Sequence, residues 1–205
     1  IGSGLVGSEM CIRDRYRRKE NSMKMKEQRG EDMLSQDVKL MINELANDVI
    51  KMFQIEIPIK DIDHAVELLG GRVEENRDDF CQYGDSILKH RDSYVIRISP
   101  FCTQERRNLT IAYELGHLFL HMGYKTNHNI WEKQKEGKFV ESMDAEQFRR
   151  ANFFSYAFLM PEHEYRKILE KYADGEKIDT KSIAEYFCVP RAAAVQRGRQ
   201  LHIIK

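Results

Sequence analysis

The chain of 205 residues is long enough for one domain of ordinary size with a buried core. Apolar residues make up 41% of it and charged residues 32%, which argues against a disordered protein, and 33 basic residues balance 33 acidic ones. That balance predicts no strong attraction to nucleic acid or membrane surfaces. Scattered cysteines and the lack of a bilayer-length apolar run are typical of a soluble protein in the reducing cytoplasm.

The N-terminal residues carry no coherent hydrophobic pattern. The string at 5–15, Leu-Val-Gly-Ser-Glu-Met-Cys-Ile-Arg-Asp-Arg, resembles translated sequencing-adapter read-through. No basic region precedes the weak apolar stretch at 1–7, so a signal peptide is not expected. We therefore leave residues 1–20 out of the fold, expect 1–30 to be an artefactual or disordered tail, and expect 31–205 to form a single domain.

Hydrophobic spacing and turn residues predict an α+β fold with a short twisted sheet packed on a long helix and its neighbours. Residues 72–98 are expected to hold three or four short strands, with a turn at Gly84-Asp85, and residues 124–142 are expected to be a loop around Trp131. The predicted helices span 32–53, 61–69, 103–121, 144–159, 162–172, 180–187 and 191–201.

The helix at 103–121 carries a pattern close to that of zinc peptidases, Tyr-Glu-Leu-Gly-His at 113–117. In the pattern H-E-x-x-H, two imidazoles four residues apart on one helical face ligate Zn²⁺, and the Glu acts as general base on the metal-bound water. Glu114 and His117 fill their positions, but Tyr113 stands at the first ligand position. Gly116 disfavours the helix by about 1 kcal/mol relative to Ala, which predicts a close approach by another element. Alone, the pattern also fits a solvated helix face.

A second block, Arg150-Ala151-Asn152-Phe153-Phe154 with Phe158-Leu159-Met160-Pro161, lies downstream. Together with residues 106–121 and the segment 183–193, it resembles the ImmA/IrrE family of small zinc metallopeptidases, over about residues 35–203. The resemblance implies a small zincin-like fold. It also implies a protein partner, a helix-turn-helix repressor of phage or mobile-element type or another transcriptional regulator.

The resemblance assigns Glu114 as the general base and His117 as the second zinc ligand. The family's third ligand, a Glu three residues before the Ala-Asn pair, falls on Phe148, so two of the three ligand positions are aromatic here. Asp144 lies one helical turn before Phe148 on the same face, and His121 lies one turn after His117. These two residues are the candidate surrogate ligands.

Three hypotheses follow. Paired aromatic residues at 113 and 148 favour a site repacked as core, in a protein with an impaired or lost zinc site that binds a regulator. Alternatively, the chain is an active zinc metallo-endopeptidase that cleaves the regulator with Glu114 and a rearranged ligand set. A DNA-binding role for the helical pair at 183–201 is disfavoured by the balanced charge. A single base change converts a His codon to Tyr, which leaves the origin of Tyr113 open.

Overall fold

The computed structural model describes residues 34–75, 85–139, 145–174 and 177–204. It divides the chain into two units, one of residues 1–33 and one of Leu34–Lys205, and only the second contains described residues. The predicted tail at 1–30 lies outside the described residues. So do the strand expected at 80–82, Gly84 of the expected turn and the candidate ligand Asp144.

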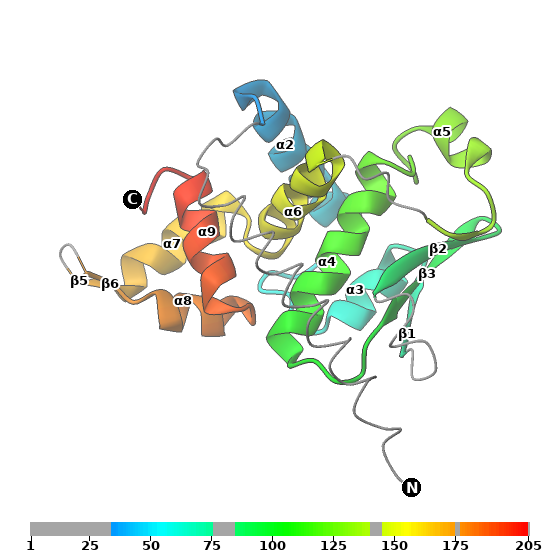
Figure 1. The fold of residues 1–205 in the computed structure, drawn as a ribbon. Coiled ribbons are helices and arrows are strands. Elements are labelled where there is room, and N and C mark those ends of the chain that lie inside the picture. The colour runs from blue at the N-terminus through cyan, green and yellow to red at the C-terminus, as the bar shows by residue number, and fades with distance from the viewer. Residues whose placement is uncertain (1–33, 76–84, 140–144, 175–176, 205) are drawn as a thin grey trace, which may run out of the picture. The chain divides into compact units, whose positions relative to one another are not determined.

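Helices dominate the described residues, and the strands are short (Figure 1). The helices are α2 Gln36–Met52, α3 Ile62–Leu68, α4 Gln104–Leu120, α5 His128–Lys133, α6 Ala145–Leu159, α7 Glu162–Tyr172, α8 Thr180–Phe187 and α9 Arg191–Gln200. The strands are β1 Arg72–Glu75, β2 Ser86–His90, β3 Ser93–Ile98, β4 Gly137–Lys138, β5 Ala173–Asp174 and β6 Lys177–Ile178.

The predicted helix starts at 61 and 103 coincide with side-chain caps, because a short polar side chain can accept the amide hydrogens that the first turn leaves unpaired. The helix predicted from residue 32 begins four residues later, at Gln36. Ser35 caps α2, Asp61 caps α3 and Thr103 caps α4. At the end of α3, Gly70 has φ +95°, a left-handed conformation that glycine adopts without strain. The helices therefore begin and end close to where the sequence placed them.

The main sheet has the strand order β1-β3-β2-β4. β3 runs parallel to β1 and antiparallel to β2, which pairs with β3 along its whole length from Ser86 to His90. β4 adds two residues to the other edge of β2, with Leu88 opposite Lys138 and Lys89 opposite Gly137. β2 is thus the strand that separates β4 from the rest of the sheet.

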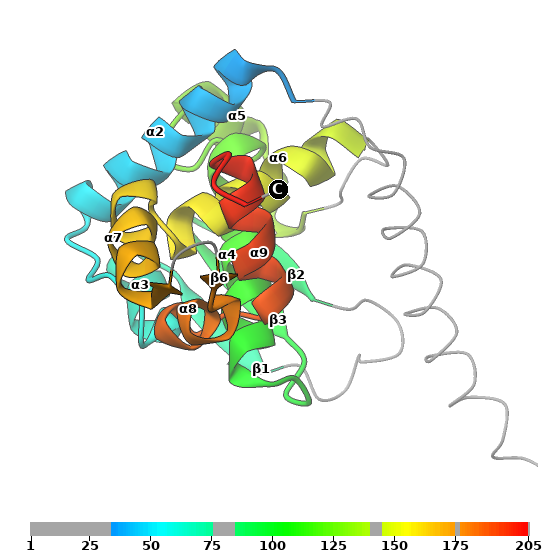
Figure 2. The same ribbon diagram turned by 90° about the vertical axis from the view of Figure 1, so that its left-hand side faces the viewer.

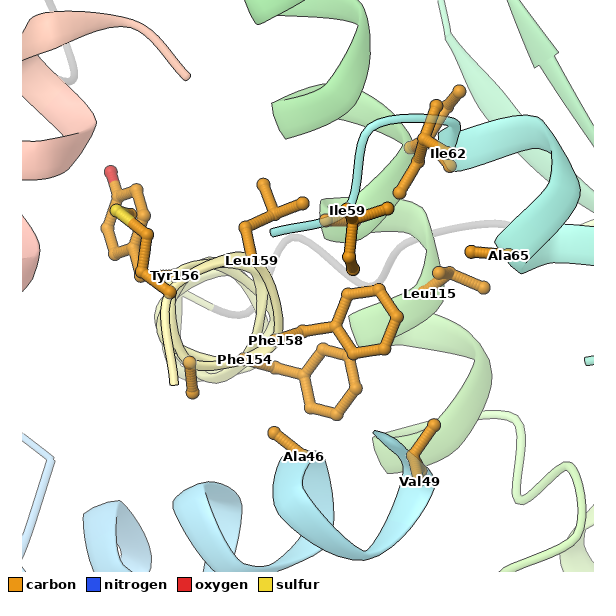
Figure 3. Close-up of a cluster of buried hydrophobic side chains, with 14 of the residues drawn as sticks. Ala46, Val49, Ile59, Ile62, Ala65, Leu115, Phe154, Tyr156, Phe158 and Leu159 are labelled. Carbon is orange, nitrogen blue, oxygen red and sulfur yellow. The ribbon is translucent and has the colours of Figure 1, made fainter. Parts of the chain in front are cut away.

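The core lies in layers, with α4 between the sheet and α6 (Figure 1) and α6 packed in turn on α2. The C-terminal helices α7, α8 and α9 pack together at the side shown in Figure 2. Figure 3 looks along α6: Phe154 and Phe158 project towards Leu115 of α4 and towards Ala46 and Val49 of α2. Both phenylalanines are completely buried, so α6 joins the two neighbouring helices through apolar contacts.

The predicted α+β class is confirmed, but two segments differ from expectation. The expected loop at 124–142 contains α5, capped by Asn127, and the strand β4. The segment between α7 and α8, for which no element was predicted, contains the small antiparallel pair of β5 and β6. α5 and β4 depend on contacts with Lys89 and β2, which are distant in sequence, and β5 and β6 have only two residues each. Hydrophobic periodicity therefore does not predict any of these elements. Within the described part of the chain, no helix is both long enough and apolar enough to cross a bilayer.

Candidate functional site

The motif helix α4 and the helix α6 cross with their main chains in close approach. A Cβ atom added to Gly116 would lie 2.8 Å from both the Cα and the carbonyl oxygen of Ala151. Side chains larger than hydrogen at position 116 would therefore force the two helices apart. The close approach predicted from Gly116 is present, and it brings the second half of α4 against the α6 segment that carries Phe148.

His117 is the centre of the site. Its side chain is fully buried, with 0% exposure, and Glu114 is also buried. The Nδ1 atoms of His117 and His121 lie 3.0 Å apart, at hydrogen-bond distance, so one imidazole carries its proton on Nδ1 and donates it to the other. This contact follows from the spacing of four residues, which places both rings on one face of the helix end.

The two aromatic residues at the ligand positions lie against each other. The ring centroids of Tyr113 and Phe148 are 5.6 Å apart, and Tyr113 also meets the ring of His117 edge-on at 4.8 Å. Both Tyr113 and Phe148 are half-buried. The residues that the family pattern assigns to one metal are therefore neighbours in space, although two of them are aromatic rings.

A fourth ring, which the sequence did not single out, completes the surroundings of His117. Phe139, just after β4, lies with its ring centroid 5.5 Å from that of His117. Its backbone N–H donates to the carbonyl of Ile87 in β2 over 2.9 Å. Phe139 belongs to a segment without periodicity, so no pattern in the sequence pointed to it.

These motifs and this fold agree with the comparisons to known proteins. A peptidase family model described as the IrrE N-terminal-like domain matches residues 75–198. The chain belongs to this family. The matched region runs from the end of β1 into α9 and includes the whole site around His117. The resemblance to ImmA/IrrE proteins and the small zincin-like fold are therefore confirmed.

The IrrE-like chain is also similar to a solved structure, a Mycobacterium tuberculosis transcriptional regulator. The TM-score is 0.53 and the identity 18%, over 76% of this chain and 45% of that protein. At that identity the likeness shows the fold alone, and this chain spans less than half of the regulator's length. No curated protein matches the chain significantly.

The family is typically zinc-dependent, and a catalytic zinc site has three protein ligands with nitrogen, oxygen or sulfur donor atoms. Phe148 offers no donor atom, and the oxygen of Tyr113 stands farther from its helix than an imidazole nitrogen would. Across the described ranges, no group of three or more His, Cys, Asp and Glu side chains is placed to hold a metal ion. The described residues therefore do not fit a zinc site of three protein ligands.

Of the two candidate surrogate ligands, the structure describes His121 but not Asp144. His121 lies beside His117, as their spacing predicts. Asp144 falls outside the described residues, so its role as a ligand stays a prediction.

The helical pair at 183–201 of the IrrE-like domain uses one of its arginines inside the core. Arg197 is 1% exposed and donates hydrogen bonds to the carbonyl of Met160 and to the side chain of Asn43. Burial lowers the pKa of its guanidinium to about 10. Arg197 therefore joins α9 to α2 and to the end of α6, and it is not available to contact phosphate groups.

Proposed function

We propose that this protein is an IrrE-like peptidase-fold domain with an impaired or lost zinc site, and that it acts by binding a transcriptional regulator. The observation that carries the proposal is the contact between Tyr113 and Phe148, whose centroids lie 5.6 Å apart. A ring pair at the two ligand positions replaces metal-to-ligand bonds with an aromatic contact. Such pairs contribute about 0.5–1.5 kcal/mol beyond their apolar burial.

Aromatic residues at both ligand positions, Tyr113 and Phe148, support loss of the metal more strongly than an aromatic residue at one position would. A single missing ligand leaves two donors from the family pattern, which a neighbouring side chain can complete. Here only His117 remains as a motif-matched ligand, and Glu114 would serve as general base only if an activated water were present. The proposal therefore assigns Glu114 no hydrolytic role in the wild-type chain.

The proposed partner is a helix-turn-helix repressor of phage or mobile-element type, or another regulator. Two observations support it: the family to which the chain belongs, and the likeness in fold to a protein that is itself named a transcriptional regulator. Binding in this sense needs a protein surface and no metal. We propose that the protein acts in the cytoplasm and that residues 31–205 form the functional domain.

The alternative function is an active zinc metallo-endopeptidase with a rearranged ligand set. The 3.0 Å separation of the His117 and His121 Nδ1 atoms favours it, because two nitrogens bound to one tetrahedral Zn²⁺ lie about 3.3 Å apart. In that case, His117, His121 and Asp144 would hold the ion, and Glu114 would keep its role as the base.

Zinc content measured by mass spectrometry separates the two functions. The wild type is expected to bind zinc weakly and substoichiometrically, and Tyr113→His with Phe148→Glu is expected to raise the content towards one ion per chain. Each single change should do less. The matched control is Tyr113→His with Gln147→Glu, which adds the same carboxylate one residue away, about 100° around α6. Stoichiometric zinc in the wild type, with proteolysis abolished by Glu114→Gln, would overturn the proposal and establish the alternative.

A further inference from the structure

We infer that a cavity between α2, α6, α7 and α9 binds a small organic carboxylate, whose negative group pairs with the buried guanidinium of Arg197. The cavity is separate from the site around His117, because none of the described residues that line it belongs to α4. The inference therefore goes beyond the proposed function, and it adds a binding site with a defined ligand chemistry.

The size of the cavity and its apolar lining set the size of the ligand. Its volume is about 190 Å³, and the side chains of Leu40, Phe153 and Leu201 are among those that line it. Figure 2 shows α2, α7 and α9, which contribute lining residues. An engineered apolar cavity of about 150 Å³ binds benzene. The volume therefore fits a ligand that has one aromatic ring, or a branched apolar group of similar size, and one small polar group.

The guanidinium of Arg197 lies behind two of the residues that line the cavity. Its Nη2 donates a hydrogen bond to Oδ1 of Asn43 over 2.9 Å, and its Cζ lies 6.0 Å from the centroid of the Phe153 ring. Arg197 itself is buried, whereas Asn43 is only half-buried. A rotation of the Asn43 side chain would therefore open the guanidinium to the cavity.

The positive charge of Arg197 makes no ion pair within the part of the chain that the structure describes. Nε donates to the carbonyl of Met160, but the buried Nη1 has no hydrogen-bond acceptor among these residues. Burial lowers the pKa of the guanidinium to about 10, so the group is still charged at neutral pH. A buried charge without a close opposite charge is unfavourable, and a carboxylate matches one edge of a guanidinium with both of its oxygens.

The charged residues that line the cavity also favour an anion. Lys39 and Arg166 are among them, while Glu162 is the only acid among the described lining residues. Glu162 attracts the charge of Arg197, but its Oε1 accepts a hydrogen bond from Nε of Arg166 over 2.8 Å. Basic side chains therefore outnumber acidic ones around the space that the ligand would enter.

These contacts define how the ligand binds. The two carboxylate oxygens accept hydrogen bonds from Nη1 and Nη2 of Arg197, and the side-chain amide of Asn43 turns away from Nη2. The apolar part of the ligand then packs against Phe153 and Leu201. A nucleic-acid backbone cannot reach the guanidinium in this way, because only a free small molecule fits inside a cavity of this volume.

Titration with benzoate, followed by NMR, tests the ligand chemistry on the full chain. Benzamide is the matched probe, since it has the same ring and a similar planar shape but no charge. Benzoate should shift the side-chain Nε–Hε resonance of Arg197 with saturation. Benzamide should bind at least about tenfold more weakly, because it lacks the charge-assisted hydrogen bonds. Equal binding of the two probes, or no saturable shift with benzoate, would overturn the inference.

Two neighbouring residues of α2 test where benzoate binds. Leu40 lines the cavity and is 57% exposed, while Met41 is 47% exposed and is not among the lining residues. Leu40→Asp should weaken benzoate binding about threefold or more by charge repulsion, and Met41→Asp should change it little. Both positions are exposed, so neither change is expected to unfold the protein. Equal effects of the two changes would place benzoate elsewhere and overturn the inference.

Asn43→Ala tests the approach to the guanidinium. The change removes the amide that a carboxylate would have to displace from Nη2, so benzoate should bind about threefold or more tightly. The matched control is Asn47→Ala, one helical turn later in α2 and outside the lining residues, which should leave the affinity unchanged. Unchanged or weaker binding in Asn43→Ala would overturn the proposed pairing with Arg197. None of these measurements involves zinc or a regulator, so their outcome is independent of the proposed function.

Discussion

Gly116→Ala probes the contact that sets the spacing of the site. In an isolated helix the change stabilises by about 1 kcal/mol, because alanine restricts the unfolded chain and favours helix. Here the new methyl group would lie 2.8 Å from two main-chain atoms of Ala151, where ordinary contacts begin at 3.4 Å. Since main-chain atoms cannot rotate away, α4 and α6 must separate, and we expect a cost of about 2–3 kcal/mol, in the upper half of the usual range for overpacking, against the helix gain of about 1 kcal/mol. We expect a net loss of about 1–2 kcal/mol.

The assay is thermal and urea unfolding followed by circular dichroism. For a domain of this size, the loss corresponds to a fall in melting temperature of about 2–8 °C. A second variant, Gly116→Ala with Ala151→Gly, is the control that identifies the contact. It should not restore stability, because the atoms that the methyl group meets are the Cα and carbonyl of residue 151 and not its side chain. A melting temperature above that of the wild type would refute the reasoning.

Three further changes test other parts of the structure. Arg197→Met removes the donors to Met160 and Asn43, so urea unfolding should show a loss of about 1–3 kcal/mol; a change within error would contradict the buried role of the guanidinium. The hydroxyl of Tyr186 donates to Glu164 over 2.6 Å, which lowers the pKa of Glu164 and raises that of Tyr186 to about 12. The pair's contribution should therefore fade as pH falls through the lowered pKa of Glu164, and again as pH rises from about 10 to 12, and Tyr186→Phe should flatten both limbs of a plot of melting temperature against pH. An unchanged plot would show that the contact is not coupled to folding. Deleting residues 1–20 should leave the melting temperature unchanged, and a drop of several degrees would show that they belong to the fold.

Helix starts and helix faces near the site could be predicted from the sequence alone, but contacts between residues of different helices could not. Thr103 predicted the start of α4 because a cap acts within one turn, and the helical period correctly placed Tyr113 and His117 on one face. The meeting of Tyr113 with Phe148 came from matching two motifs of one family rather than from periodicity. Helical spacing alone says nothing of residues 35 positions apart.

The segment that carries Phe139 could not be predicted in the same way. α5 has six residues, too few to be stable by itself, and depends on the burial of Trp131 and on hydrogen bonds from Lys89, which is distant in sequence. β4 has two residues, and its register is set by β2 rather than by an alternation of its own. Contacts between residues so far apart in the sequence depend on the folded arrangement of the chain, so local sequence patterns do not predict them.

The main-chain contact between Gly116 and Ala151 also bears on how such proteins diverge. Because backbone atoms set the distance between the two helices, the architecture does not depend on a metal ion to hold them together. A lineage with this scaffold can lose its ligands by a few substitutions without losing its fold, and the altered surface then becomes open to selection for recognition. If the zinc site is lost as proposed, the same scaffold would let substitutions at a few positions restore it without rebuilding the fold.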